Sequence, residues 1–507
     1  MPRKLVLVVV DALHPAMLRR AVDEGVAPTF AALLERGRLV EDCVSSFPSV
    51  TPVASSEMLT GMGPDGHWVI GMNWFHRLER RYIEYGSSFE ATRTFGLFRA
   101  MYDLVYNMNL DHLSWEAPTV FERFGDAGVR TAATPFLIYR GRRRHELSLE
   151  GLARMAAAAA NFRHAVWGPD EFFYGDLYSS RPTGCGPSFT RPGTRDEYSA
   201  CVAEELVREG AYDFLLFSLP DNDFHSHRFG PEETVDSIAK ADANFARIVE
   251  AGGGLDRFLD QHAVILTADH AQVPVQHGLP LAELLAEDWA VLQPNADRPE
   301  EAEIAVSPTS RAGGVYILDS GPGHDAAHDR VRGRLRGTEG IDLVAWLAGA
   351  DGAPLPRHGV GLPGGDPVYG VVERNGFELR FRPGGQLRDA RGTGWELHGE
   401  PEALAADITR GRFDAEAYPD GLARLWSALT SPHAGDVLIS AADGYECVDW
   451  GGVSHAGGGS HGSLGREDSV GPVLFVGCGP RRPERNAQWA LRDLAPIMLD
   501  YFGVKRG

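Results

Sequence analysis

Three short stretches of the chain are apolar at nearly every position, and an acidic residue follows each within two positions. They cover residues 5–10, 214–219 and 262–267. Runs of this length without polar alternation are typical of strands buried on both faces of a parallel sheet. Helical patterns lie between and beside them, at 15–36, 118–127, 149–160, 194–209 and 235–251. The pattern predicts an α/β fold with a mostly parallel central sheet flanked by helices.

The composition of the chain changes between residues 276 and 435. Gly and Pro become frequent there, and strand-like runs such as 314–318 are shorter. A buried-strand pattern resumes at 436–440. We therefore expect an inserted α+β subdomain at 276–435, within a core formed by residues 1–275 and 436–507.

One segment places a hydroxyl group where a helix is expected to begin. It reads Phe47-Pro48-Ser49-Val50-Thr51-Pro52 and continues to Thr60-Gly61. Thr51 is a good N-cap, and Pro52 suits the first helical position. A hydroxyl at a helix N-terminus lies among unpaired N–H groups that hold phosphate readily. The alternative interpretation is a plain cap on a surface helix.

Acidic and histidine residues follow the predicted strands. Ligands in open α/β sheets sit outside the carboxyl ends of the strands, so these side chains are expected to converge. Nitrogen and oxygen ligands without thiolate suit zinc, and also manganese or iron, and coordination would favour the alkoxide of the threonine. The alternative is that each histidine is separately satisfied in a loop. The converging set is Asp11, Thr51, Asp223, His227, Asp269, His270 and His461.

The composition limits the partners. The 507 residues carry a formal charge of −21, which argues against binding to a nucleic-acid polymer. The five cysteines are scattered and odd in number, which argues against a disulfide framework and a thiolate zinc site. No segment approaches the roughly 20 apolar residues that span a bilayer. The apolar run at 5–10 is too short for a signal peptide, so we expect no membrane partner and a cytoplasmic location.

The ordered motifs resemble the nucleotide pyrophosphatase/phosphodiesterase branch of the alkaline phosphatase superfamily. The likeness covers residues 5–275 and 436–505. It rests on Asp11, the Thr51 segment with Thr60-Gly61, Pro64 and His67, Asp223-x-x-x-His227 followed by Phe229-Gly230-Pro231, Thr267-Ala268-Asp269-His270, and Ser460-His461-Gly462.

The resemblance implies two zinc ions and a nucleophile. Asp11, Thr51, Asp269 and His270 would hold one ion, and the second would be held by Asp223, His227 and His461. Thr51 would attack phosphorus and form a phosphothreonine. The family's phosphate-binding asparagine falls at Met72 by spacing, so the neighbouring Asn73 is the candidate. The rival ligands are Asp221, His225 and His455.

The resemblance also implies a function. We expect a two-metal phosphohydrolase that cleaves phosphodiester or pyrophosphate bonds in a small phosphate ester, for which a nucleotide is one option. Phosphomonoester or phosphonate hydrolysis at the same centre is the nearest alternative. A catalytically silent metal-containing binding protein is an alternative of another class. A homodimer is left open.

Overall fold

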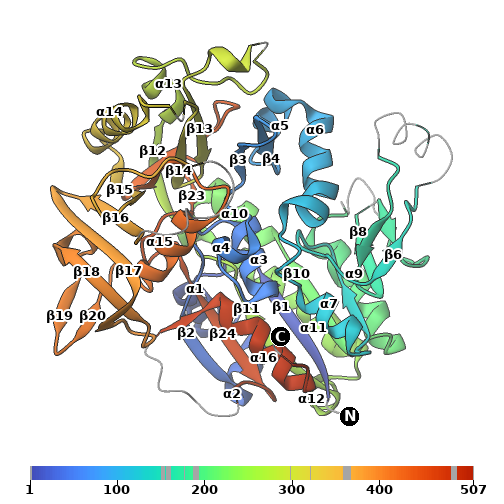
Figure 1. Cartoon of the computed structure of the whole chain (residues 1–507). Helices are drawn as coiled ribbons and strands as arrows, with labels where there is room; N and C mark the ends of the chain where they lie inside the picture. Colours follow the sequence, from blue (N-terminus) through green and yellow to red (C-terminus); the bar gives the residue numbers. More distant parts are fainter. Residues whose placement is uncertain are drawn as a thin grey trace.

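The computed structural model describes residues 3–149, 155, 162–175, 177–186, 193–296, 298–319, 321–357, 367–480 and 488–505. Two nine-stranded sheets organise the fold. In Figure 1 the strands and helices that follow residue 280, in yellow and orange, occupy the left side, whereas the helices of the central sheet lie below and to the right.

The central sheet confirms the predicted α/β architecture. Strand β1 (Lys4–Val10) lies at its centre and pairs in parallel with β10 (Phe214–Leu219) and β11 (His262–Thr267). These are the three predicted apolar strands, and nearly all of their residues are buried. The sheet order is β25-β2-β24-β11-β1-β10-β5-β8-β9. The remaining strands are β2 (Arg38–Val44), β5 (Thr131–Ala133), β8 (Glu171–Tyr174), β9 (Tyr178–Ser179), β24 (Val470–Val476) and β25 (Trp489–Ala490). Strand β24 runs antiparallel to β11 and β2, so the sheet is mixed but mostly parallel.

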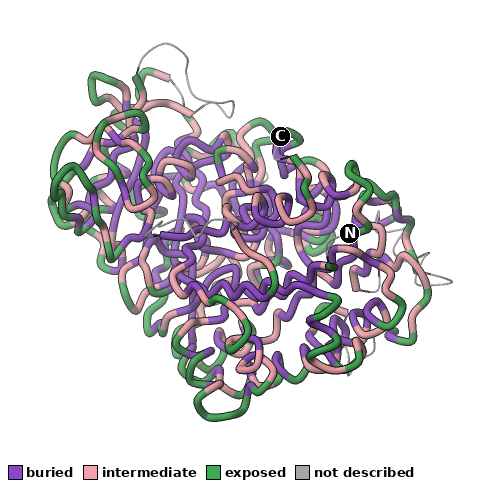
Figure 2. Tube along the Cα trace, turned by 90° about the horizontal axis from the view of Figure 1, so that it is seen from below, coloured by how far each residue is buried: buried purple, intermediate pink, exposed green. Residues whose placement is uncertain are grey.

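Helices cover both faces of this sheet because side chains alternate along β1. Val6, Val8 and Val10 pack in the core with one group of helices, whereas Leu5, Leu7 and Val9 pack with the other. The first group is α1 (Pro15–Asp23), α2 (Pro28–Arg36), α9 (Asp196–Glu209), α11 (Val235–Ala251) and α12 (Leu255–Gln261). The second is α3 (Thr51–Thr60), α7 (Val120–Asp126) and α16 (Leu494–Phe502). Figure 2 shows the buried trace running through the middle of the molecule with exposed segments around its rim.

Several local predictions differ from the structure. The helix expected at 15–36 is two helices, because the chain turns at Gly25 in the left-handed region. Helix α3 begins at Thr51, but Val50 occupies the N-cap position and no side chain caps the helix, so the threonine hydroxyl is left for other contacts. The helix expected at 149–160 lies almost wholly outside the described residues.

The second sheet is antiparallel along nearly its whole length and has its own helices. Its strands are β13 (Ile304–Thr309), β14 (Ala312–Ile317), β15 (Ile341–Ala348), β16 (Tyr369–Arg374), β17 (Phe377–Arg388), β18 (Gly394–Gly399), β19 (Asp407–Thr409), β20 (Arg412–Asp414) and β21 (Val437–Ala441). Helices α13 (Leu281–Ala286), α14 (His324–Arg336) and α15 (Gly421–Thr430) accompany it. The expected return to the core at residue 436 differs from the strand pairing, since β21 pairs with β14 and β15.

Shorter elements lie between the two sheets and around the site described below. A three-stranded sheet contains β12 (Val273–Leu279), β22 (Gly444–Cys447) and β23 (Gly459–Ser460). Two hairpins are β3 (Asn73–His76) with β4 (Arg81–Glu84), and β6 (Arg143–His145) with β7 (Val166–Gly168). The helical elements are α4 (Pro64–His67), α5 (Phe89–Phe95), α6 (Leu97–Tyr102), the π-helical segment Asp103–His112 and α10 (Asp221–Phe229).

Two observations bear on the environment of the protein. None of the helices in the described part of the chain has the length and apolar character needed to cross a bilayer. Cys185 and Cys201 form a disulfide, although the scattered cysteines gave no reason to expect one. Disulfides persist in oxidising compartments, so this bridge is an observation against the cytoplasmic location expected above.

We expect the core of the central sheet to dominate stability. Leu216 of β10 is fully buried, so Leu216→Ala should lower the free energy of unfolding by about 2–5 kcal/mol through lost contacts and a residual cavity. Chemical denaturation measures the change. The matched control is Leu78→Ala, because Leu78 is 66% exposed and the same substitution there should change stability by less than about 0.5 kcal/mol. Equal effects at both positions would contradict the assigned core.

Candidate active site

The carboxyl ends of β1, β10 and β11 meet at one edge of the central sheet, and acidic residues follow all three. Asp11 comes directly after β1, Asp269 lies two residues after β11, and Asp223 stands in the first turn of α10, which follows β10. This parallel arrangement gathers residues that are far apart in the sequence. It brings together six of the predicted ligands and the predicted nucleophile.

Asp11, Asp269 and His270 form the first group. One ligand atom from each lies within 4.8 Å of the others. His270 Nε2 is 3.7 Å from Asp11 Oδ1 and 3.4 Å from Asp269 Oδ2. Both of these carboxylate oxygens are buried and accept no hydrogen bond from the described residues. Buried polar oxygens are seldom left without a partner, so this pair fits the ligands of a hard cation.

Asp223, His270 and His461 form the second group, with ligand atoms again within 4.8 Å of one another. His461 Nε2 lies 3.9 Å from Asp223 Oδ1. His227 is one helical turn beyond Asp223, and its Nε2 lies 3.4 Å from Asp223 Oδ2. The rings of His270 and His461 stack with centroids 3.6 Å apart. The two groups therefore share one continuous site.

The backbone fixes the orientation of the three histidine rings. Nδ1 of His227 lies 2.8 Å from the carbonyl of Gly459, Nδ1 of His461 lies 2.8 Å from the carbonyl of Ser49, and Nδ1 of His270 lies 3.1 Å from the carbonyl of Ala271. A carbonyl accepts a hydrogen bond from Nδ1–H, which leaves the lone pair of Nε2 on each ring available to a metal ion. Metal-binding histidines commonly have this arrangement.

Thr51 lies at the centre of the site. Its Oγ1 is 3.2 Å from His270 Nε2. Thr51 is the first residue of α3 and lies at the positive end of the helix dipole, although Pro52 has no N–H and the N–H groups of Val53 and Ala54 already donate to the Val50 carbonyl. The threonine is therefore placed between a cluster of metal-binding groups and the positive end of a helix dipole.

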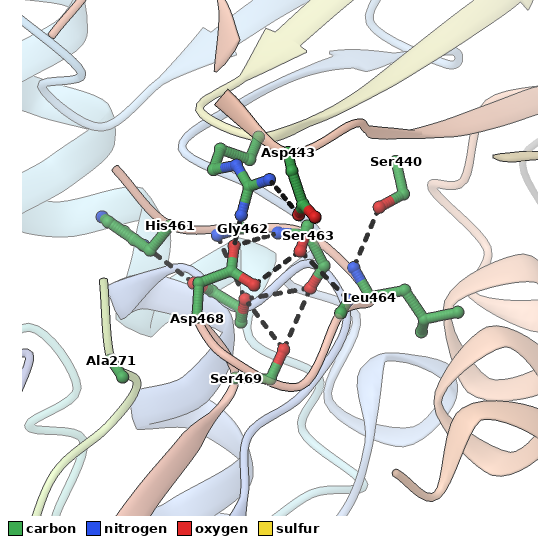
Figure 3. Close-up of polar contacts among 12 residues, drawn as sticks. Ala271, Ser440, Asp443, His461, Gly462, Ser463, Leu464, Asp468 and Ser469 are labelled. Atoms are coloured by element: carbon green, nitrogen blue, oxygen red, sulfur yellow. Dashed lines mark hydrogen bonds and ion pairs between the residues drawn. The ribbon is translucent and has the colours of Figure 1, made fainter. Parts of the chain in front are cut away.

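A network of hydrogen bonds holds the loop that carries His461 (Figure 3). The Ser463 hydroxyl donates to Asp468, and the Ser463 N–H donates to the same carboxylate over 2.9 Å. The Leu464 N–H donates to the hydroxyl of Ser440 in β21 over 3.0 Å. The Ser469 hydroxyl donates to the Ser463 carbonyl over 3.1 Å. This network ties the His461 loop to the second sheet.

The electrostatics of the site are those of crowded carboxylates and neutral imidazoles. Burial, reinforced by the charges of Asp269 and Asp223, raises the pKa of Asp11 well above its usual range. Burial lowers the pKa of His461 and of His227, which keeps both rings unprotonated at neutral pH. Unprotonated imidazoles and excess negative charge favour divalent cations, so the residues present fit two such ions.

The site opens into a cavity of about 330 Å³. One wall is polar and contains Thr51 with the aspartates and histidines named above. The opposite wall is apolar or aromatic, and no Lys or Arg of the described residues lines the cavity. Apart from Met72, none of the residues of that wall was predicted from the sequence. That wall is formed by Met72, Tyr85, Leu104, Phe136, Leu137, Tyr174 and Phe224.

The structure does not bring Asn73 to the cavity. Its buried side-chain amide donates to the carbonyl of Pro308 and accepts a hydrogen bond from the Ser307 hydroxyl, since β3 packs against β13. Met72, at the spacing first considered, does line the cavity.

Of the three rival ligands, only His455 lines the cavity. Asp221 pairs with Arg195 at 2.9 Å, and His225 Nε2 lies 2.8 Å from the carbonyl of Glu233, so neither reaches the cluster. His455 does line the cavity, where its ring stacks on His227 with centroids 3.9 Å apart.

Comparison with known proteins places this geometry in a family. The family model for type I phosphodiesterase / nucleotide pyrophosphatase matches residues 5–346, more than half of the chain. No curated protein matches the sequence.

Two solved structures share the fold at low sequence identity. Phosphonoacetate hydrolase from Sinorhizobium meliloti 1021, in complex with phosphonoformate, has a TM-score of 0.54 at 16% identity, over 99% of this chain and 95% of that one. Murine ectonucleotide pyrophosphatase / phosphodiesterase 5 has a TM-score of 0.56 at 11% identity, over 100% and 96%. An inactive threonine-to-alanine variant of the murine protein was solved with AMP. The chain belongs to the type I phosphodiesterase / nucleotide pyrophosphatase family of the alkaline phosphatase superfamily.

Proposed function

We propose that the protein is a two-metal phosphohydrolase that cleaves phosphodiester or pyrophosphate bonds with Thr51 as nucleophile. The observation that supports this most directly is the position of the Thr51 hydroxyl, 3.2 Å from His270 Nε2, at the junction of two groups of potential ligands. A silent binding protein would not need a free hydroxyl at that position. The inactive threonine variant of the murine relative is consistent with the same role.

The residues divide into two sets around the nucleophile. Asp11, Thr51, Asp269 and His270 would hold one ion, and Asp223, His227 and His461 would hold the other. Divalent ions at these positions, Zn²⁺ in the first place and Mn²⁺ or iron as alternatives, would supply positive charge that favours the alkoxide of Thr51 and neutralises phosphoryl oxygens.

Backbone and side-chain groups of the protein would position the substrate and the ligands. The positive end of the α3 dipole lies at Thr51 and favours the negative charge of a phosphoryl group, and the fixed imidazoles keep the ligand set rigid. The Thr51 oxygen forms a bond to phosphorus while the ester oxygen leaves and gains a proton. Water then cleaves the phosphothreonine, which regenerates the hydroxyl and releases the phosphate product.

The cavity favours a neutral leaving group over an anionic one. Phosphonoacetate hydrolase, a structural relative, acts on a substrate with a carboxylate. Here the described lining offers no Lys or Arg to pair with a carboxylate, whereas Tyr85, Phe136 and Phe224 offer apolar area. An aromatic or apolar ester group fits that wall, and the AMP complex of the murine relative makes a nucleotide a reasonable choice. Phosphonate hydrolysis is therefore the second candidate.

The test of this function compares substrates on the metal-loaded protein. Bis(4-nitrophenyl) phosphate should be hydrolysed at least about tenfold more efficiently than 4-nitrophenyl phosphate, and phosphonoacetate should be the poorest of the three, because the cavity lacks cationic partners. Release of nitrophenol and of acetate measures the rates. A preference for the monoester or for phosphonoacetate would replace the proposal with the corresponding alternative.

Removing the nucleophile should abolish turnover without emptying the site. In Thr51→Ala we expect kcat for the diester to fall by about 10³-fold or more, with the metal content largely retained, because all six carboxylate and imidazole groups of the proposed ligand set remain. Elemental analysis and initial rates measure both. Thr94→Ala is the control, since the Thr94 hydroxyl only donates to a carbonyl in its own helix. Undiminished hydrolysis by Thr51→Ala would refute the nucleophile assignment.

Removing a ligand should change both metal content and stability. Asp269→Asn replaces a buried carboxylate of the first group, so we expect about one bound ion in place of two and little activity. Chelation of the unaltered protein should lower its melting temperature, because ions that bind only the folded state stabilise it. Asp260→Asn, at an exposed position in α12, is the control. If Asp269→Asn kept two ions at full occupancy, the first ligand set would be wrong.

A further inference from the structure

The turn between β13 and β14 reaches from the second sheet into the catalytic cavity. Thr309 pairs with Ala312, so Ser310 and Arg311 form a two-residue connection. Ser310 lines the cavity together with Thr51 and His461. A residue outside the central sheet therefore contributes to the wall beside the predicted nucleophile.

The backbone of Ser310 has an unfavourable conformation for a residue with a side chain. Its φ is +50°, in the left-handed region where glycine is preferred and serine is uncommon. Tight hairpin turns that need a positive φ usually contain Gly, Asn or Asp. Non-glycine residues held in this region are concentrated at active sites, where the surrounding structure imposes the conformation.

Contacts with neighbouring residues hold Ser310 in this left-handed conformation. The Arg311 N–H donates to the carbonyl of His461 over 2.8 Å, and the Cys447 N–H donates to the carbonyl of Ser310 over 2.7 Å. The buried Arg311 guanidinium pairs with Asp468 at 2.9 Å. A Cβ at Gly462 would approach the Arg311 nitrogen to 3.0 Å, so the two loops are in close contact. Ser310 is thus fixed relative to the metal ligand candidate His461.

The side chain of Ser310 is available for a ligand. Its hydroxyl makes no hydrogen bond within the described residues, although the residue is half-buried at the cavity wall. The neighbouring polar groups of the same hairpin are already engaged, since Ser307 and Pro308 hold the Asn73 amide. The candidate Asn73 is therefore occupied by structural contacts outside the cavity, and Ser310 offers an unengaged donor at the cavity wall.

We propose that Ser310 is a substrate-binding residue that donates a hydrogen bond from its hydroxyl to an oxygen of the phosphoryl group. This inference rests on the proposed phosphohydrolase function, whose site it extends. The left-handed backbone then has a role, because it holds Ser310 at the wall of the cavity that also contains Thr51. Two substitutions separate the contribution of the hydroxyl from that of the backbone conformation.

Ser310→Ala removes the hydroxyl and keeps the Cβ, whereas Ser310→Gly removes both. We expect kcat/KM for the diester to fall about 10- to 100-fold in both variants, as for a lost hydrogen bond to a charged group. The melting temperature should rise in Ser310→Gly and stay near the unaltered value in Ser310→Ala, because only glycine relieves the left-handed conformation. Both variants should retain the full metal content.

The control is Asn375→Gly. Asn375 has a φ of +53° in the exposed turn between β16 and β17 and does not line the cavity, so its replacement should leave kcat/KM unchanged. A second readout is the inhibition or binding constant of inorganic phosphate on the metal-loaded protein. We expect phosphate to bind about tenfold or more weakly to both Ser310 variants.

The outcomes distinguish the two proposals. Unchanged kcat/KM and phosphate binding in an active enzyme would overturn the role of Ser310 while the phosphohydrolase function stands. Loss of activity together with loss of metal would also overturn it, since that pattern indicates a structural role. If the unaltered protein hydrolysed no phosphate ester, the proposed function would fail, and phosphate binding would still decide whether Ser310 contacts a phosphoryl oxygen.

Discussion

The constraint on which the structure depends is the concentration of negative charge at the carboxyl edge of the central sheet. Asp11, Asp223 and Asp269 converge there, and within the described residues no Lys or Arg forms an ion pair with any of them. Among the described residues, their only neighbours at salt-bridge distance are His227, His270 and His461. Buried like charges repel, which is why the pKa of Asp11 rises so far. The converging carboxylates destabilise the folded chain on their own. Bound cations would remove this repulsion, so folding and metal binding would be coupled at this edge.

Rigidity at the site comes from both sheets. The central sheet supplies the aspartates and His270, whereas the loop of His461 is held by groups from the second sheet and its helices. The buried Arg424 of α15 donates to the carbonyl of Ser46 over 3.0 Å and to that of Leu464 over 2.7 Å, which joins the approach to Thr51 with the loop that follows His461. Residues 276–435 therefore help to position the proposed site, because Arg424 binds both the segment before Thr51 and the loop after His461.

The sequence predicted the central strands well because strands buried on both faces have a pattern that no other local structure imitates. Residues 5–10, 214–219 and 262–267 all form the expected strands. The strand near 436–440 has the same apolar pattern but joins the other sheet, since pairing is decided by distant partners that a local pattern cannot reveal. The same limit applies to the site. Strand ends indicated where carboxylates and histidines gather, but the packing of Asn73 on β13 and the position of Ser310 at the cavity depend on contacts between distant residues, from Asn73 to Ser307 and from Ser310 to Cys447.

Shared fold and shared metal ligands do not by themselves decide the substrate. This chain resembles a phosphonoacetate hydrolase and a nucleotide pyrophosphatase / phosphodiesterase about equally, with TM-scores of 0.54 and 0.56. The polar half of the cavity comes from residues that follow β1, β10 and β11 and from the start of α3 and the His461 loop, whereas the apolar half includes Tyr85 and Phe136, which lie beside a hairpin and in a loop, segments that change readily between relatives. Substrate choice must therefore be inferred from that second half. A carboxylate that enters a wall of aromatic rings loses its hydration without gaining a cationic partner, which disfavours its binding. A flat neutral group gains apolar contact with the same rings. Under the proposed function, this apolar wall without cationic side chains is the feature that favours an ester over a phosphonate.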